Sequence, residues 1–129
     1  MAMNNISTAA RNAACDGVVD QIDTGAGTSH IRIYTAAFAT LLAELDFAAT
    51  AFGAAAAGVA TAAAIVGEAS APAAGTAAVC RIVDKDGTTV YEGTVTATGG
   101  GGDIELSNVV IAIADTVDIT SMTVTMPAS

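Results

Sequence analysis

The residues of this chain that could perform acid–base or nucleophilic chemistry are few: one histidine, two cysteines and thirteen acids among 129 residues. Ser29 precedes His30, and Asp20 and Asp23 lie shortly before them, so a Ser-His-Asp arrangement could form here. Such chemistry needs a serine exposed on a sharp turn, and the Gly-x-Ser-x-Gly sequence typical of that turn is absent around Ser29. We therefore predict no catalytic residue and no enzyme activity, and we expect His30 on the solvent or interface face of a strand.

The two cysteines, Cys15 and Cys80, are the candidates for redox or metal chemistry. They form no Cys-x-x-Cys pair, and the lone His30 lies 15 residues after Cys15, so the spacing of zinc ligands is missing. We expect two small buried thiols in a reducing compartment. A disulfide within or between chains stays open, because sequence does not give the distance between the two residues.

One acidic turn has part of a calcium-binding sequence. Asp84-Lys85-Asp86-Gly87 would belong to an EF-hand loop only with acids at positions 82 and 93, which are Ile82 and Gly93. We interpret the segment as a hairpin turn and predict no metal site. Calcium held between chains stays open for the acids Asp84, Asp86, Asp115 and Asp118.

Two glycine-containing segments lack the rest of a nucleotide-binding motif. Gly25-Ala26-Gly27 begins like a dinucleotide fingerprint, but His30 stands where the last glycine belongs, and a predicted helix precedes it. We interpret it as a helix terminator. The run Gly99–Gly102 is not followed by Gly-Lys-Ser/Thr, so it is interpreted as a flexible loop. We predict no cofactor.

The composition excludes several classes of function. The net charge is −9, with only three arginines and one lysine, so the chain cannot neutralise a run of phosphates and we predict no nucleic acid partner. Residues 47–67 carry no charge, but they are rich in alanine and flanked by acids, so we predict no membrane span and no membrane partner. From the first residues, which lack a basic region and a long apolar run, we expect no signal peptide. The aromatic residues are expected in the core or in contacts: Tyr34, Phe38, Phe47, Phe52 and Tyr91.

The first half of the chain predicts one helix and then strands. Ser7 is a plausible N-cap, and Cys15, Val18, Val19 and Ile22 share one face of an amphipathic helix over residues 7–23, with Asp16, Asp20 and Asp23 largely on the other face. Residues 30–35 alternate with period two, as in a half-buried strand. Residues 41–47 predict a second strand, and a helical turn over residues 38–45 competes for its first half.

The alanine tract, residues 48–64, is ambiguous, because alanine favours helix whereas the glycines, threonines and valine within it do not. We favour one strand over residues 58–66. Further strands are predicted at 77–84, 88–96, 104–106, 109–113 and 117–126, with a bulge at Gly93 and a tight turn at Asp115-Thr116.

These elements predict a mainly β fold: an antiparallel, jelly-roll-like β-sandwich preceded by one amphipathic helix. Its core should be thin, because 31 of the apolar residues are alanine. We expect an N-terminal arm over residues 1–6 and a single domain over residues 7–129. Small residues would permit close contacts between subunits.

Taken together, the sequence resembles small virion proteins of tailed bacteriophages that decorate or cement the capsid. The resemblance rests on residues 7–13, 25–28 with 31–35, 51–53, 58–62 and 81–90. It implies a β-sandwich on the outer surface of the virion capsid, made in the host cytoplasm. The implied partners are the major capsid protein and further copies of this chain, in a homotrimer. A tail, neck or head-tail joining protein stays open, and so does a host-surface binding module.

Overall fold

The structure is a computed structural model that describes residues 5–128, and the predicted mainly β chain with one N-terminal helix is confirmed. A short 3₁₀ helix, η1, connects the first two strands. In chain order the elements are α1 (Thr8–Ile22), β1 (His30–Tyr34), η1 (Ala36–Phe38), β2 (Leu41–Asp46), β3 (Val59–Thr61), β4 (Gly75–Thr76), β5 (Val79–Val83), β6 (Thr89–Ala97), β7 (Ile104–Leu106), β8 (Val110–Ile111) and β9 (Thr123–Thr125).

The largest sheet has five strands in the order β2-β1-β5-β6-β7. Its first four strands pair antiparallel, whereas β7 pairs parallel with β6. The sheet is therefore mixed, and the prediction of antiparallel pairing is wrong at this edge. The reason is local: Gly99 and Gly101 adopt positive φ angles of 86° and 79°, and the loop folds over Thr96 before it returns beside β6. Two two-stranded sheets, β3–β9 and β4–β8, complete the fold.

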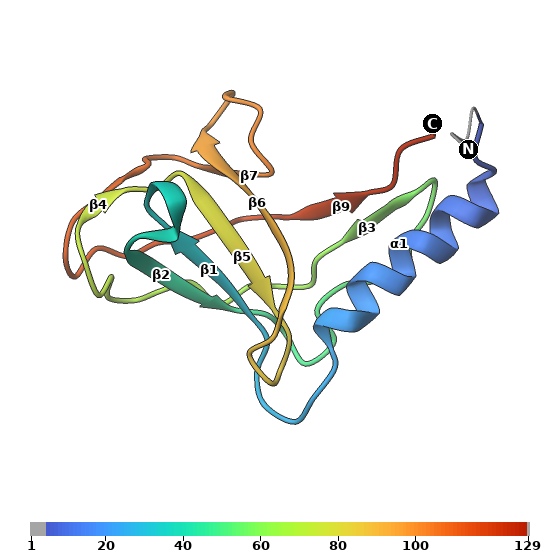
Figure 1. The fold of residues 1–129 in the computed structure, drawn as a ribbon, viewed down its shortest axis with the longest axis horizontal. Helices are drawn as coiled ribbons and strands as arrows, with labels where there is room; N and C mark the ends of the chain where they lie inside the picture. The colour runs from blue at the N-terminus through green and yellow to red at the C-terminus, as the bar shows by residue number, and fades with distance from the viewer. Residues whose placement is uncertain (1–4, 129) are drawn as a thin grey trace.

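One core joins these elements. On β1, Ile31 and Ile33 are buried and the alternate residues are half-exposed, as the period-two pattern predicted. Helix α1 lies against β3 and β9, at the end of the molecule where Ile6 pairs with Ala128 (Figure 1). The core also takes residues from the sheet (Leu42, Leu45, Ile82 and Val95), from α1 (Cys15, Val19 and Ile22) and from the C-terminal part (Ile111, Val117, Ile119 and Met122).

The C-terminal segment, residues 109–128, runs across the molecule and pairs with several other segments of the chain (Figure 1). Glu68 and Val117 exchange backbone hydrogen bonds, and Ala77 N–H donates to the Val109 carbonyl. Residues 67–77 and 109–118 thus form an irregular antiparallel pair, which we call the ribbon. The same segment pairs with β3 through β9, and the Ile6 N–H donates to the Ala128 carbonyl at 2.8 Å. Residues 1–4 of the predicted arm lie outside the described residues.

Helix α1 begins and ends close to the predicted residues. The Ser7 hydroxyl accepts from the Ala10 N–H at 3.1 Å, which confirms the predicted N-cap. The C-cap is Asp23, with Gly25 beyond it at φ 109°. Cys15, Val19 and Ile22 are buried as expected, whereas Val18 is only half-buried.

The amphipathic pattern suggested that the acidic face of α1 lies in solvent. In the structure this face binds the backbone of the alanine tract. Asp16 Oδ1 accepts from the Ala55 N–H at 2.7 Å, and Asp23 Oδ1 accepts from the Ala51 N–H at 3.0 Å. Asn12 Oδ1 accepts from the Gly58 N–H at 2.8 Å. The three acceptors fall on one side of the helix, because residues 12, 16 and 23 differ by about 40° or less in angular position at 100° per residue. The helix therefore holds residues 51–58 in a non-helical path.

The alanine tract departs from its prediction in extent. The predicted strand over residues 58–66 is confirmed only for Val59–Thr61. Ala57 and Gly58 have positive φ angles of 52° and 78° and form a tight turn in which Ala56 and Val59 exchange backbone hydrogen bonds. The helix that alanine content alone would favour does not form, because the backbone donors are bound by α1 and by neighbouring segments.

The predicted strands 30–35 and 41–47 are confirmed as β1 and β2. The competing helical turn over residues 38–45 does not form, and the 3₁₀ helix η1 precedes it. The register shifts at Ile33/Tyr34, and this irregularity lets Leu42 face the core together with Ala43 and Leu45, although regular alternation would put Leu42 on the opposite face. In the second hairpin the shift lies at Ile82/Val83 and not at Gly93. Gly93 instead gives space to Asp103, whose carboxylate would be 2.9 Å from an added Cβ.

The hairpin turn at residues 84–87 is confirmed, and the strands around it are β5 and β6. The strand predicted at 104–106 is β7, whereas those at 109–113 and 117–126 shorten to β8 and β9. The predicted turn at Asp115-Thr116 lies earlier, because Ala114 adopts φ 71° and the Asp115 N–H donates to the Ala112 carbonyl. Among residues 5–128, no helix has the length and apolar character needed to cross a membrane.

Replacing one helix acceptor should release the alanine tract. We expect Asp16→Ala to lower the free energy of unfolding by about 1–3 kcal/mol, because the Ala55 N–H loses a charged acceptor. The matched control is Asp20→Ala, at an exposed position of the same helix, which should change it by less than about 0.5 kcal/mol. Urea unfolding followed by circular dichroism measures both; equal effects would contradict this role for Asp16.

Candidate functional site

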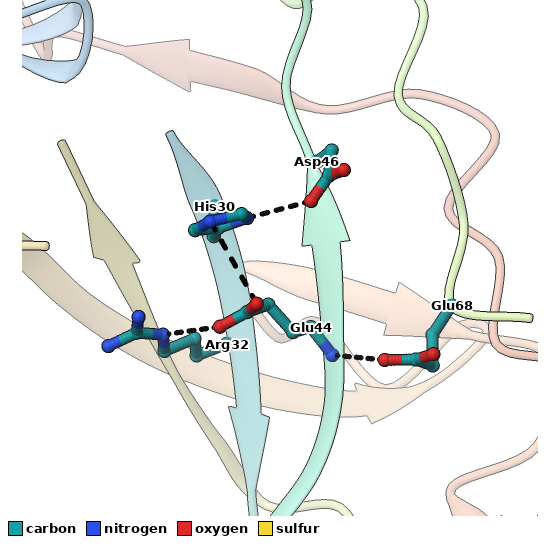
Figure 2. A network of polar contacts seen from close by, with 5 residues as sticks. All are labelled: His30, Arg32, Glu44, Asp46 and Glu68. Atoms are coloured by element: carbon teal, nitrogen blue, oxygen red, sulfur yellow. Dashed lines mark hydrogen bonds and ion pairs between the residues drawn. The ribbon is translucent and has the colours of Figure 1, made fainter. Parts of the chain in front are cut away.

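A group of linked polar side chains lies on β1 and β2, on the face opposite the core. The antiparallel register places His30 opposite Asp46 and Arg32 opposite Glu44. His30 Nδ1 lies 2.7 Å from Asp46 Oδ1, and the Arg32 Nε–H donates to Glu44 Oε2, also at 2.7 Å. His30 Nε2 lies 3.8 Å from the other oxygen of Glu44, so the imidazole stands between two carboxylates (Figure 2).

A fifth residue connects this group to the ribbon. The Glu44 backbone N–H donates to Glu68 Oε2 at 3.2 Å, and the other Glu68 oxygen accepts from the Ser70 N–H (Figure 2). Beside it, Asp46 and Val66 exchange backbone hydrogen bonds. Residues 66–68 therefore cover the outer edge of β2, which would otherwise offer unpaired donors to another chain.

This geometry does not assemble the Ser-His-Asp arrangement considered from the sequence. The carboxylate beside His30 is Asp46, whereas Asp23 binds the Ala51 N–H. The Ser29 side chain is buried, with its hydroxyl unpartnered, and the second ring nitrogen of His30 faces Glu44. The group is suited to holding two strands together, since each charge has an opposite charge or a donor next to it.

A second ion pair lies further along the same face. The Arg81 Nε–H on β5 donates to Glu92 Oε2 on β6 at 2.7 Å, and this hydrogen bond raises the pKa of Arg81. The guanidinium carbon of Arg81 lies 4.1 Å from the ring centre of Phe38 and 5.5 Å from that of Tyr34. Tyr34 and Phe38 are thus contact residues, as expected, and Phe47 and Phe52 pack together in the core.

Both cysteines are buried free thiols, which agrees with the preferred expectation from the sequence. The Cys15 thiol donates to the Val124 carbonyl at 3.3 Å, so it links α1 to β9. Burial raises the pKa of Cys80 to about 11, and the nearby charge of Asp103 adds to the shift. Burial likewise raises the pKa of Tyr91.

The acidic residues considered for calcium bind the chain's own backbone or stand apart. Asp84 Oδ1 accepts from the N–H groups of Asp86 and Thr88 inside the hairpin turn. Asp115 Oδ2 accepts from the Ala112 N–H at 2.8 Å. Over residues 5–128, no group of three or more His, Cys, Asp or Glu side chains is arranged to hold a metal ion.

The glycine run is held by similar contacts. Glu105 accepts from the N–H groups of Gly99 and Gly101, at 3.2 and 3.0 Å, and Thr96 Oγ1 accepts from the Gly102 N–H. The flexible loop expected here is therefore tied to β6 and β7. Gly25 and Gly27 pack closely on the hairpin turn, at Asp86 and Lys85, and so connect α1 to β1 without leaving space for a ligand.

Two open hollows lie next to one another beside β7 and β8. One, of about 550 Å³, is bordered by Asp103, Glu105 and Asp118, with threonine and serine hydroxyls. The other, of about 180 Å³, is bordered by Val110, Asp115 and Asp118. The charges of Asp115 and Asp118 are evident from the sequence. The exposure of Val110 is not, because residues 109–113 have the apolar pattern of a buried strand.

The raised pKa of Cys80 has two measurable consequences. In the folded protein the Cys80 thiol should react with iodoacetamide at pH 8 far more slowly than in urea, because it is buried and protonated. The folded state keeps this proton to higher pH than the unfolded chain, so stability should be unaffected below pH 9.0 and fall between there and about pH 11.

Cys80→Ala removes this titrating thiol, so the free energy of unfolding of the variant should fall less between pH 9.0 and about pH 11. Urea unfolding at a series of pH values measures the difference. Part of the fall should persist, because the half-buried Tyr91 also holds its proton to higher pH in the folded state. Alkylation of Cys80 at equal rates in folded and unfolded protein would contradict the assignment.

Comparison of the chain with models of protein families, with curated proteins and with solved structures finds no match.

Proposed function

We propose that this chain is a non-enzymatic structural protein of a tailed-phage virion, which decorates the capsid and cements the joints between major capsid protein subunits. In this proposal it binds the outer surface of the shell as a homotrimer after synthesis in the host cytoplasm. Its partners are the major capsid protein and further copies of itself. The resemblance in residues 7–13 and 81–90, among other segments, supports the proposal of this family.

The observation that carries the proposal is that most of the acidic side chains serve the fold itself. His30 stands between two carboxylates, and its neighbour Arg32 is paired. Carboxylates and cations that are bound within the chain are not available to react with a substrate. This favours a protein that acts by binding partners over an enzyme. The acids that accept backbone N–H groups are Asp16, Asp23, Glu68, Asp84, Asp103, Glu105 and Asp115.

A second feature in favour is the alanine that stays outside the core. Among the described residues only five alanines are buried, so most of the 31 leave their methyl groups at or near the surface, where each removes little area from water. Small domains are marginally stable, at about 5–15 kcal/mol, so burial against neighbouring subunits adds a substantial share. Small side chains also permit flat contacts at short backbone separation.

We extend the proposal to the fold, as a jelly-roll-like β-sandwich. One layer is the five-stranded sheet, and the other is the ribbon together with β3 and β9. Support comes from the common core, to which Ile31 and Ile33 contribute from the sheet and Ile111, Val117 and Met122 from the C-terminal segment. Such a body presents two broad outer faces, which suits a protein placed between other subunits.

Copy number in purified virions tests this function. We expect quantitative mass spectrometry to find the chain in copies on the order of hundreds per particle, as lattice decoration requires, against about a dozen for a neck or head-tail joint. Particles assembled without it should release their genome at lower temperature or at low salt. Absence of the chain from virions would overturn the proposal, and about a dozen copies would favour the joining protein.

A further inference from the structure

The larger of the two hollows lies where two segments of the chain have incomplete backbone pairing. It is bordered by β7, the outermost strand of the five-stranded sheet, and by residues 118–123, which lead into β9 (Figure 1). Within residues 5–128, β7 pairs with β6 on one side and with no strand on the other. A strand edge of this kind offers N–H and C=O groups to another chain.

The pairing of β7 with β6 shows which of its backbone groups are free. The Leu106 carbonyl accepts from the Thr98 N–H at 3.0 Å, so Leu106 directs its backbone groups toward β6. Because successive residues of a strand direct these groups to opposite sides, the N–H and C=O of Glu105 point away from β6. Glu105 borders the hollow together with Asp103 and Ser107. The free edge of β7 thus lies beside this open space.

The segment that leads into β9 has free backbone groups as well. In the described part of the chain, residues 118–121 take part in no backbone–backbone hydrogen bond. The Ala62 N–H donates to the Met122 carbonyl at 2.9 Å, so Met122 directs its backbone groups toward the strand that carries β3. Its neighbours Ser121 and Thr123 direct theirs to the opposite side, and both border the hollow.

The side chains around the hollow limit the chemistry of what can bind there. Three acids border it, Asp103, Glu105 and Asp118, and no basic residue does. Asp103 and Glu105 accept backbone N–H groups of the chain but keep their negative charge, and Asp118 is exposed. The other polar groups are hydroxyls, from Thr98, Ser107, Thr120, Ser121 and Thr123. A ligand with Lys or Arg side chains therefore complements the charge of the hollow.

We infer that the larger hollow receives an extended, basic segment of a partner protein, which adds a strand beside β7. The N–H and C=O of Glu105 bond to one side of this segment, and those of Ser121 and Thr123 bond to the other. Main-chain hydrogen bonds of this kind supply affinity, and the acids around the hollow select basic side chains. The inference rests on the proposed function in one respect: the segment belongs to the major capsid protein.

A second copy of this chain does not supply such a segment. The chain has four basic residues, and none of them lies in a free extended segment. Arg11 belongs to α1, and Arg32 and Arg81 are ion-paired on inner strands of the sheet. Lys85 lies in the hairpin turn, where its Nζ donates to the Ala49 carbonyl at 2.9 Å. The basic segment must therefore come from another protein.

A backbone variant with a matched side-chain control tests the inference. The probe is purified heads of the major capsid protein that lack this chain, with the full chain added and bound protein measured by cosedimentation at two salt concentrations. Ser121→Pro removes a backbone donor to the added segment and should weaken binding by about three- to tenfold. Ser121→Ala keeps that donor and should bind as the original chain does. Binding of the original chain should weaken at the higher salt, because the segment is basic.

Hydrogen exchange followed by mass spectrometry gives a second measurement, on the unaltered chain. The amides of Glu105, Ser121 and Thr123 should exchange quickly in the free protein and at least about tenfold more slowly when the chain is bound to heads. The amide of Ala36, at an exposed position of η1, is the control and should exchange at the same rate in both. This measurement decides the matter if Ser121→Pro fails to fold, as judged by circular dichroism.

The outcomes separate this inference from the proposed function. If the original chain binds heads but Ser121→Pro binds as well as Ser121→Ala and the three amides stay unprotected, the hollow is not the docking site while the cementing function stands. Binding that does not weaken with salt overturns the basic character of the segment. If the original chain does not bind heads at all, the cementing function fails and the inference fails with it. Protection of the three amides when the isolated chain self-associates assigns the hollow to a second copy and overturns the inference.

Discussion

The fold depends on hydrogen bonds from backbone N–H groups to carboxylate and amide oxygens of side chains. The strands are short, and two of them have only two residues, so regular pairing leaves many donors without a partner. Asp16, Asp23 and Asn12 supply acceptors for the alanine tract, while Asp84 and Glu105 do so for turns. The acid excess that gives the net charge of −9 is thus in large part structural.

This arrangement explains how a chain so rich in alanine avoids forming more helix. Alanine is the best helix former, and it has no side chain that could fix another conformation. Residues 51–58 follow an irregular path that ends in a tight turn, because α1 offers oxygen atoms at fixed positions along one side. A charged acceptor is about twice as effective as a neutral one, so a few contacts can outweigh a weak local preference.

Local patterns in the sequence predicted the parts that local forces determine. Ser7 as N-cap, the alternation around Ile31 and the turn at residues 84–87 need only neighbouring residues, and all three are confirmed. The pairing of His30 with Asp46, the parallel β6–β7 edge and the path of the alanine tract depend on segments distant in sequence. Charge alone suggested that Asp16 faces solvent, because nothing near it reveals the Ala55 N–H.

Covered edges have a consequence for how this chain can associate. Residues 66–68 close the edge of β2, and Asn108 and Asp115 occupy two donors beside β8. With these edges closed, association by adding strands is disfavoured there, which also protects the chain from uncontrolled aggregation. On the outer face of the sheet the projecting charges Arg32 and Arg81 are likewise paired within the chain, whereas Asp118 borders open hollows. The polar contacts that stabilise the fold therefore also close strand edges and pair the basic charges of the sheet.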